Sequence, residues 1–324
     1  MLIAYIGRRL LVSIPVLLGV TLVTFLLMHA TAGEVIPGLE FNPSLTPTEI
    51  AQIRANLGLD RPLYVQYLTW LAGLAQGDFG RSLIDGTPVV SHILDRFPNT
   101  LELTLSGMIL GIGLAIPLGV AGAVRRGSSL DQFLTVGSVA GVSVPAFWLG
   151  LLLILLFAVE ARQHGLPWLP SGGAISPLGG GDILDRARHL VLPATVLAFG
   201  YIAIWSRYTR SSMLEVLSQD YVRTARAKGM SERRVLYLHA LRNAVLPLIT
   251  LIGLELPALV SGAAIVEVVF SWPGIGRLTL ESALDYDYTM VLGLTTFAGL
   301  LVIAGNLLAD VLYAVLDPRI SPGR

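Results

Sequence analysis

Long runs of apolar residues, separated by polar segments, dominate the chain. Six runs approach or exceed the ~20 apolar residues that an α-helix needs to cross a hydrocarbon core of ~30 Å. The pattern predicts an all-α integral membrane protein with six transmembrane helices, whose two ends lie on the same side of the bilayer. The predicted spans are residues 10–28, 101–124, 133–159, 190–205, 244–269 and 290–316.

The composition agrees with this pattern. Hydrophobic residues make up 54% of the 324 residues and charged residues 14%, against roughly 25% charged in a typical soluble domain. The first run follows Arg8 and Arg9, as a signal peptide core does, but it is longer than the roughly 7–15 residues of such a core. We predict a retained anchor. The chain has no cysteine, which excludes disulfides and thiolate metal sites.

The distribution of arginine and lysine predicts the orientation. If the N-terminus is cytoplasmic, the outside segments are longer than the inside ones, yet they hold fewer basic residues and most of the acids. Cytoplasmic loops carry an excess of Lys and Arg, so both termini and residues 220–243 are predicted to be cytoplasmic. Outside residues 220–243, the basic residues placed inside are Arg8, Arg9, Arg125, Arg126, Arg207, Arg210, Arg319 and Arg324.

The predicted spans divide the chain into four parts. Helix start and stop signals within the second part predict one helix from Thr46 to Gly58 and another after Pro62. Residues 160–189, rich in Gly and Pro, are predicted to form an ordered loop near the membrane face, with Trp168 as an interfacial anchor. The parts are an anchor helix (1–30), an extracytoplasmic segment (31–99), a five-helix core with a loop at 213–243 (100–316), and a cytoplasmic tail (317–324).

Prolines lie well inside several predicted spans. Each removes a backbone donor and frees a carbonyl, which must find another partner. Kinked helices around a cavity are one outcome, and the general frequency of proline in membrane helices is an equally good explanation. These residues are Pro117, Pro145, Pro193, Pro247 and Pro257.

Residues 220–243, "DYVRTARAKGMSERRVLYLHALRN", hold the only lysine of the chain and a cluster of arginines. Asp220 can N-cap a helix from residue 221 to about 228, Gly229 can end it in the left-handed conformation, and Ser231 can cap a second helix whose first turn carries Glu232. A helix of about eight residues is unstable alone in water and must pack against something.

The first of these two helices has the composition of a docking element. Its small residues, Thr224, Ala225, Ala227 and Gly229, allow close backbone approach, and Arg223, Arg226 and Lys228 offer charge. Basic helices that lie on anionic lipid usually carry large apolar side chains opposite the charges, whereas this helix offers mainly Tyr221, Val222 and alanines. The sequence therefore favours docking into another protein over binding to lipid.

The segment "DYVRTARAKG", followed by "ALRNAVLPLIT", resembles the cytoplasmic signature loop of the membrane subunits of binding-protein-dependent ABC importers. Nearly the whole chain resembles the dipeptide/oligopeptide permease B branch. The further strings that carry this resemblance are "RRLLVSIPVLLGVTLVTFLL", "LGLDRPLYVQYLTWLAGLAQGDFGRSL", "PNTLELTL", "SVPAFWLG", "VFSWPGIGRL" and "LYAVLDPRI".

The resemblance implies a coupling helix that docks in a cleft on a cytoplasmic ATPase subunit, with Ala225 and Gly229 at the small positions of the motif. Arg223 stands where the motif has an acidic residue, which departs from the pattern. The coupling-helix residues carried over are Tyr221, Val222, Arg223, Thr224, Ala225, Arg226, Ala227, Lys228 and Gly229.

The resemblance also implies partners and a location. The partners are a second homologous permease subunit, two cytoplasmic ATPase subunits, an extracytoplasmic solute-binding protein, a peptide substrate and the lipid bilayer, with no nucleic acid. The location is the plasma (inner) membrane of a prokaryote. ATP and magnesium are expected at the partner subunits, and no cofactor on this chain. The substrate class stays open between di- or oligopeptides, nickel and oligosaccharides.

The sequence does not predict an enzyme or a metal site. A phosphate-binding P-loop needs Gly-Lys-Ser/Thr, and the single lysine, Lys228, lies between Ala227 and Gly229. There is no G-x-S-x-G nucleophile elbow. The histidines are scattered, with no H-E-x-x-H pair for zinc; they are His29, His92, His164, His189 and His239.

The rival prediction is a secondary, ion-coupled transporter or a channel. Ionisable residues inside spans are functional candidates, and Glu255 lies in the middle of the fifth span while Asp310 lies late in the sixth. Glu102 and Glu267 lie near outer ends. A cavity-lining or helix-pairing role is favoured for Glu255 over proton transfer, and Asp310 is expected to have an arginine partner. An ABC importer requires its ATPases but survives collapse of the proton gradient, which discriminates the two.

Overall fold

The computed structural model describes residues 2–32, 46, 48, 60–177, 180–261 and 263–316. Within these residues the chain is helical, and β structure is limited to an isolated bridge between Arg81 and Pro88. The prediction of six apolar membrane-length helices is confirmed in the described part of the chain. They cover Leu11–Ala30, Val89–Val124, Ala146–Gln163, Ile183–Leu217, Glu232–Gly253 and Tyr288–Ala309.

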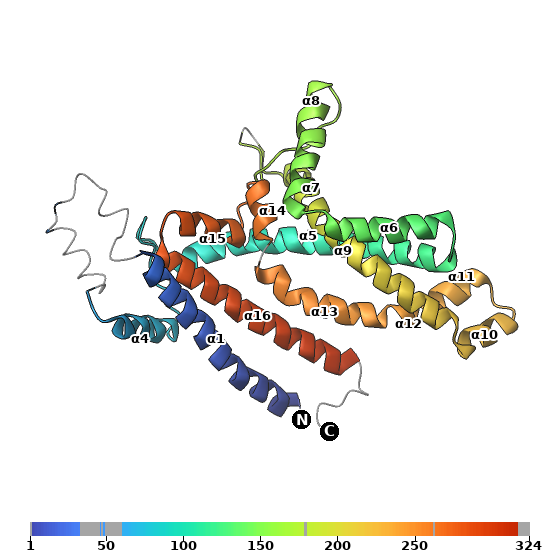
Figure 1. Cartoon of the computed structure of the whole chain (residues 1–324), viewed down its shortest axis with the longest axis horizontal. Coiled ribbons are helices and arrows are strands. Elements are labelled where there is room, and N and C mark those ends of the chain that lie inside the picture. Colours follow the sequence, from blue (N-terminus) through green and yellow to red (C-terminus); the bar gives the residue numbers. More distant parts are fainter. Residues whose placement is uncertain are drawn as a thin grey trace.

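Two long helices, α5 (Val89–Val124) and α9 (Ile183–Leu217), pack along one another and form the centre of the molecule (Figure 1). Glycines make this close approach possible. A Cβ atom on Gly107 would lie 2.6 Å from the Leu197 Cβ, and one on Gly119 would lie 2.5 Å from the Thr209 Cβ. Without a hydrophobic effect between helices in lipid, small residues at such contacts provide the packing.

Three further helices complete the bundle. Helix α16 (Tyr288–Leu316) packs against α1 (Leu2–Ala32) on one side and α13 (Leu246–Ser261) on the other, and α13 in turn contacts α5 and α9. In Figure 1 these helices run alongside the central pair.

Both central helices are longer than predicted. Helix α5 begins after Pro88, so it starts 12 residues before the predicted span and runs through the boundary drawn between residues 99 and 100. Helix α9 begins after Asp182, whose side chain accepts a bond from the Asp185 N–H, and it ends at Leu217. Pro98, Pro117 and Pro193 lie inside these helices without ending them.

The predicted third span, 133–159, is wrong as one continuous helix. Helix α6 (Ser129–Ser143) ends before Val144, which is extended (φ −79°, ψ 120°), because the residue before a proline disfavours the helical region. After Pro145 the chain continues as α7 (Ala146–Leu153), the π-helical η1 (Ile154–Glu160) and α8 (Ala161–Gln163). This second stretch projects from the body in Figure 1.

The predicted fifth span, 244–269, is also interrupted. Helix α13 ends at Ser261, Ala263 has a non-helical backbone (φ −93°, ψ 61°), and α14 (Ala264–Val269) is a separate short helix. It leads into α15 (Ile275–Leu284), which packs against α14, α5 and α16.

The predicted extracytoplasmic segment is described only in part. The helix predicted after Pro62 is confirmed as α4 (Leu63–Leu74), which is tied to α1 by a 2.9 Å hydrogen bond between the Thr21 and Tyr67 hydroxyls. The helix predicted from Thr46 to Gly58 lies outside the described residues, apart from Thr46 and Thr48.

Residues 160–189 are partly helical at both ends. Trp168 lies between two guanidinium groups, with Arg162 Cζ 4.8 Å and Arg188 Cζ 5.6 Å from its ring centroid. Arg188 also donates a 3.1 Å bond to the Trp168 carbonyl. These contacts order the Gly- and Pro-rich loop around the tryptophan that was predicted to be an interfacial anchor.

Candidate functional site

The segment predicted to dock with another protein forms a short helix, α10 (Asp220–Ala227). The N-cap is Gln219 (φ −74°, ψ 148°), so the prediction of Asp220 as N-cap is wrong by one residue. Asp220 lies in the first turn instead, where a negative charge interacts favourably with the helix dipole. Gly229 has a φ of +74° and ends the helix in the left-handed conformation, as predicted.

The second helix begins where the sequence placed it, as α11 (Glu232–Arg234), followed by the π-helical η2 (Val235–Leu241) and α12 (Arg242–Ala244). Ser231 stands at the N-cap position, but its side chain makes no capping bond. Glu232 pairs with Arg226 at 2.7 and 3.2 Å, which joins the two arms of the turn.

One face of α10 is buried against the chain itself. Val222 is 0% exposed and Ala225 6% exposed, and both pack with Val235 of η2 and with residues at the end of α9. Since an eight-residue helix is marginal alone, this contact stabilises α10. The family resemblance put Ala225 at a small position of the motif. Its small side chain allows α10 to lie close to η2 and α9.

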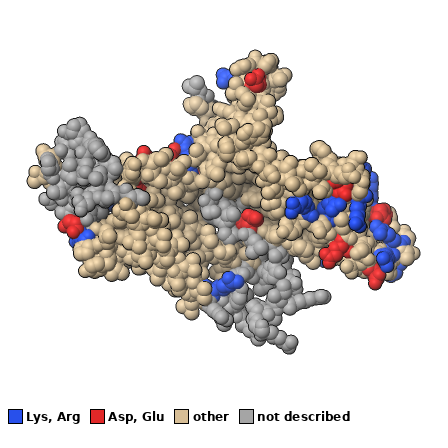
Figure 2. All heavy atoms as spheres, viewed as in Figure 1, with Lys and Arg blue, Asp and Glu red and all other residues tan. Residues whose placement is uncertain are grey.

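The other face of α10 is exposed and mainly basic. Asp220 and Arg223 are 96% and 73% exposed, and their 3.6 Å ion pair is correspondingly weak. In the described part of the chain no ion pair involves Lys228, Arg233 or Arg234. Figure 2 shows charged side chains gathered at this end of the molecule, beside a largely uncharged body. The exposed residues of α10 and of the turn that follows it are Asp220, Tyr221, Arg223, Thr224, Arg226, Ala227, Lys228 and Gly229.

The base of α10 is continuous with the membrane helices. Met213 of α9 and Ala240 and Ala244 of the η2–α12 stretch are fully buried in one cluster with Val120 and Ala123 of α5. Asn243 of α12 also donates a 2.9 Å bond to the Tyr221 hydroxyl. These contacts connect the base of α10 to α5, α9 and α12.

A buried ion pair braces the same end, and sequence reasoning missed it. Asp131 of α6 accepts a 2.8 Å bond from Arg210 Nη2 of α9 and a 2.9 Å bond from the Gly127 N–H. The bond from Arg210, followed by the one from Gly127, lowers the pKa of Asp131 to about 2. The signal available in the sequence was local: Ser128 caps α6, and Asp131 follows it by three residues.

The acids proposed for ion coupling have different surroundings. Glu102 forms a bidentate pair with Arg186, and Glu267 is 0% exposed and accepts bonds from the Thr100 hydroxyl (2.8 Å) and the Arg277 N–H (2.9 Å). Both acids therefore hold elements of this chain together.

The two acids predicted as cavity or helix-pairing groups lie on neighbouring helices. Glu255 is half-buried on α13. Asp310 lies on α16, and its side chain, with the arginine partner predicted for it, is outside what the structure describes.

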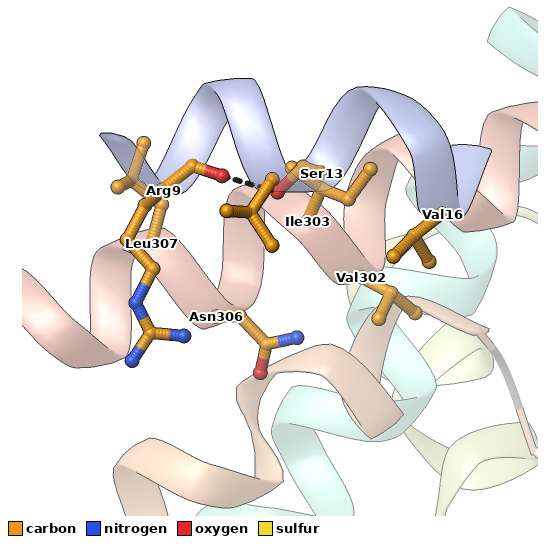
Figure 3. A pocket seen from close by; sticks show the side chains of 8 residues that line it. Arg9, Ser13, Val16, Val302, Ile303, Asn306 and Leu307 are labelled. Atoms are coloured by element: carbon orange, nitrogen blue, oxygen red, sulfur yellow. Dashed lines mark hydrogen bonds between the residues drawn. The ribbon is translucent and has the colours of Figure 1, made fainter. Parts of the chain in front are cut away.

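A groove of about 200 Å³ lies between α1 and α16. Its wall is mostly aliphatic, with Val12, Val302 and Ile303 among its residues, and the side chains of Arg9 and Asn306 extend toward its open side (Figure 3). The Ser13 hydroxyl is used within α1, where it donates a 2.9 Å bond to the Arg9 carbonyl. Nothing in this wall forms a catalytic or metal-binding set, and in the described residues no group of three His, Asp or Glu side chains could hold a metal.

Comparisons with known proteins cover the whole length of the chain. Residues 111–322 match the family described as "Binding-protein-dependent transport system inner membrane component", and residues 1–104 match the family described as "Binding-prot-dependent transport system membrane comp, N-term".

Three relatives illustrate the range of similarity. The oligopeptide transport system permease protein AppB of Bacillus subtilis is 47% identical over 98% of this chain and 99% of that protein. The di/tripeptide transport system permease protein DppB of Pseudomonas aeruginosa is 41% identical over 100% of both. The glutathione transport system permease protein GsiC of Salmonella paratyphi A is 40% identical over 98% of both.

Proposed function

The chain belongs to the family of binding-protein-dependent transport system inner membrane components, and on this premise we propose that it forms one half of the translocation path of an ATP-driven importer for short peptides. Relatives named for oligopeptides, di- and tripeptides and glutathione align with the chain over nearly their whole length. Their shared cargo class, peptides of a few residues, supports the proposed substrate.

The proposed complex contains this chain, a second homologous permease subunit, two cytoplasmic ATPase subunits and an extracytoplasmic solute-binding protein. ATP and magnesium would bind to the ATPase subunits, and this chain would act as a permease rather than as an enzyme. The basic end would face the cytoplasm of a prokaryote, in accordance with the excess of arginine there, so that both termini are cytoplasmic.

The observation that carries the proposal is the two-sided construction of α10. Its Val222 face is fixed to η2 and to the end of α9, while its basic face is exposed and available to a partner. Closure of the ATPase subunits would move α10 and, through the cluster around Met213, the membrane helices α5 and α9. Access to the path would then alternate by rigid-body motion of these helices.

The proposal is tested by purifying the tagged chain with its partners in mild detergent and measuring the ATPase activity that co-purifies. Lys228→Glu reverses an exposed charge on the docking face, and we expect it to reduce the associated ATPase activity at least tenfold. Arg61→Glu is the matched control, because Arg61 is also exposed but lies far away, next to α4. It should leave the activity within twofold of wild type.

Two results would contradict the proposal. One is equal ATPase activity in both charge-reversal variants. The other concerns energetics in cells: peptide uptake that stops when the proton gradient is collapsed, and continues when ATP is depleted, would favour the ion-coupled alternative.

A further inference from the structure

Helix α13 carries a stripe of residues that points toward the central helices. Leu248 is buried and Ile252 partly buried, and both pack in a cluster with Trp205 of α9 and Ala115 of α5. Glu255 follows Ile252 by three residues, and side chains three and four residues apart lie on the same face of a helix. Glu255 therefore continues the face of α13 that is turned toward α5 and α9, one turn beyond the packed cluster.

Glu255 lies inside α13, among apolar residues. It is nine residues from the start of this helix at Leu246, or about 14 Å at a rise of 1.5 Å per residue. Its side chain is half-buried, and it has no hydrogen-bond or ion-pair partner among the residues that the structure describes. A carboxylate on so apolar a helix of a membrane protein is costly without a counter-charge.

The chain's own arginines do not supply this counter-charge in the described structure. On α9, which Glu255 faces, Arg210 is paired with Asp131 near one end, and Arg186 is paired with Glu102 near the other. Arg188 and Arg207, the other arginines of α9, form no ion pair with Glu255 among the described residues.

An aromatic pair of α9 belongs to the same packing cluster as Ile252, one turn from Glu255. Tyr201 of α9 is half-buried, its ring stacks on Trp205 with centroids 4.5 Å apart and planes inclined by 14°, and the charge of Glu255 acts on it. A carboxylate beside an aromatic face suits an ammonium group, which is attracted by both the negative charge and the ring.

We propose that Glu255, with Tyr201 beside it, binds the N-terminal ammonium group of the peptide during its passage. This inference rests on the proposed function, and it adds a contact that depends on the backbone terminus shared by all unmodified peptides. Such a contact would bind peptides of different sequence equally well, because it does not involve their side chains.

The test uses the complete transporter in proteoliposomes, with its ATPase subunits and binding protein, and follows uptake of trialanine at a limiting concentration. We expect Glu255→Gln to lower uptake about tenfold while binding-protein-stimulated ATPase activity stays within twofold of wild type. Glu255→Asp should retain at least a third of wild-type uptake. Glu160→Gln, a change of the same chemistry at a residue of η1 whose side chain is 46% exposed, should transport normally.

The pH dependence separates an ammonium contact from a merely structural one. Peptide α-amino groups titrate near pH 8, so the ratio of wild-type to Glu255→Gln uptake should fall toward one between pH 7 and pH 9.5. Contributions of the binding protein cancel in this ratio. Tyr201 is the titratable group that faces Glu255 from α9 in the described structure, and Tyr201→Phe should leave the pH profile of the ratio unchanged.

Unchanged uptake in Glu255→Gln, an equal loss of ATPase activity, or a ratio that does not vary with pH would each overturn the inference while leaving the proposed function intact. Failure of the proposed function would appear differently, as wild-type proteoliposomes that show no ATP-dependent peptide uptake.

Discussion

The two ends of the helix bundle use charge in opposite ways. At the end formed by α14 and α15, Glu267 is 0% exposed and Asp287 2% exposed, and each accepts several hydrogen bonds from its own chain. At the end formed by α10 and α11, Arg223 and Lys228 are exposed, and the ion pairs of α10 lie at the surface. Figure 1 places α15 and α10 at opposite ends of the central helices.

This difference indicates what each set of charges is for. A buried carboxylate with all its bonds satisfied by one chain stabilises that chain's fold, and removing it leaves donors without partners. Exposed pairs contribute little to folding, so the charges of α10 remain available for a second molecule. Substitutions at the α14–α15 end should therefore change stability, and substitutions on the exposed face of α10 should change association.

The largest loss of folding stability is expected for Glu267→Ala. The change would leave the Thr100 hydroxyl and the Arg277 N–H without their acceptor and would open a cavity, at a cost of about 3 kcal/mol or more. Thermal unfolding in detergent measures this loss of stability. Glu281→Ala is the control, because its 2.7 Å pair with Arg277 is partly exposed and should contribute less than about 1 kcal/mol. Equal melting temperatures of the two variants would contradict the proposed contrast.

A second, smaller loss of folding stability at the same end of the bundle is expected for Gly274→Ala. A Cβ atom there would lie 2.4 Å from the Glu267 carboxyl group, which is held by its own hydrogen bonds and cannot retreat. Overpacking of this kind costs roughly 1–3 kcal/mol. The control is Gly137→Ala in α6, where nothing lies within 4 Å of the new Cβ. It should raise the melting temperature slightly, since alanine favours the helix over glycine; a fall as large as that of Gly274→Ala would argue against the steric explanation.

The sequence predicted local features well and long-range contacts poorly. Gly229 and Pro62 mark ends of short helices by their own backbone preferences, and both were identified correctly. The break at Val144 was missed although Pro145 was noted, because proline is tolerated inside membrane helices where neighbours satisfy the freed groups.

The structural role of Glu267 could not be predicted, since its partner Thr100 is 167 residues away in the chain. Ala225 shows a subtler limit. A small residue in a helix indicates close packing but does not say whether the neighbour belongs to the same chain, and here it does.

Val222→Ala tests the apolar attachment of the charged end. Val222 is fully buried between η2 and the end of α9, and removing two methyl groups costs on the order of 1–2 kcal/mol. Because α10 is a short helix at one end of the bundle, we expect the melting temperature of the whole chain to change by less than it does for Gly274→Ala. Binding-protein-stimulated ATPase activity of the complex should fall severalfold. Val23→Ala, at an exposed valine of α1, is the control. A loss of activity equal to that of Val222→Ala would show that the packing of Val222 against η2 and α9 is not the cause.

The narrowest prediction concerns the pH dependence at Asp131, which is the exception at the charged end because it is buried and satisfied like Glu267. Its bonds to Arg210 and Gly127 lower its pKa to about 2, below the ordinary value near 4. A carboxyl group with a lowered pKa stabilises the fold fully above its unfolded pKa and loses this contribution as the pH falls through the folded value. The melting-temperature difference between wild type and Asp131→Asn should therefore be constant from pH 5 to 9 and shrink only between about pH 4 and pH 2.

Asp220→Asn provides the comparison for this measurement, since Asp220 is 96% exposed and its removal should change the melting temperature only slightly at any pH in that range. A difference for Asp131→Asn that declined near pH 6 would mean that the carboxyl group is not held ionised by Arg210. In that case the ion pair between α6 and α9 would weaken near the pH at which transport takes place. Burial would then no longer distinguish the charges that stabilise this chain from the exposed charges that are available to a partner.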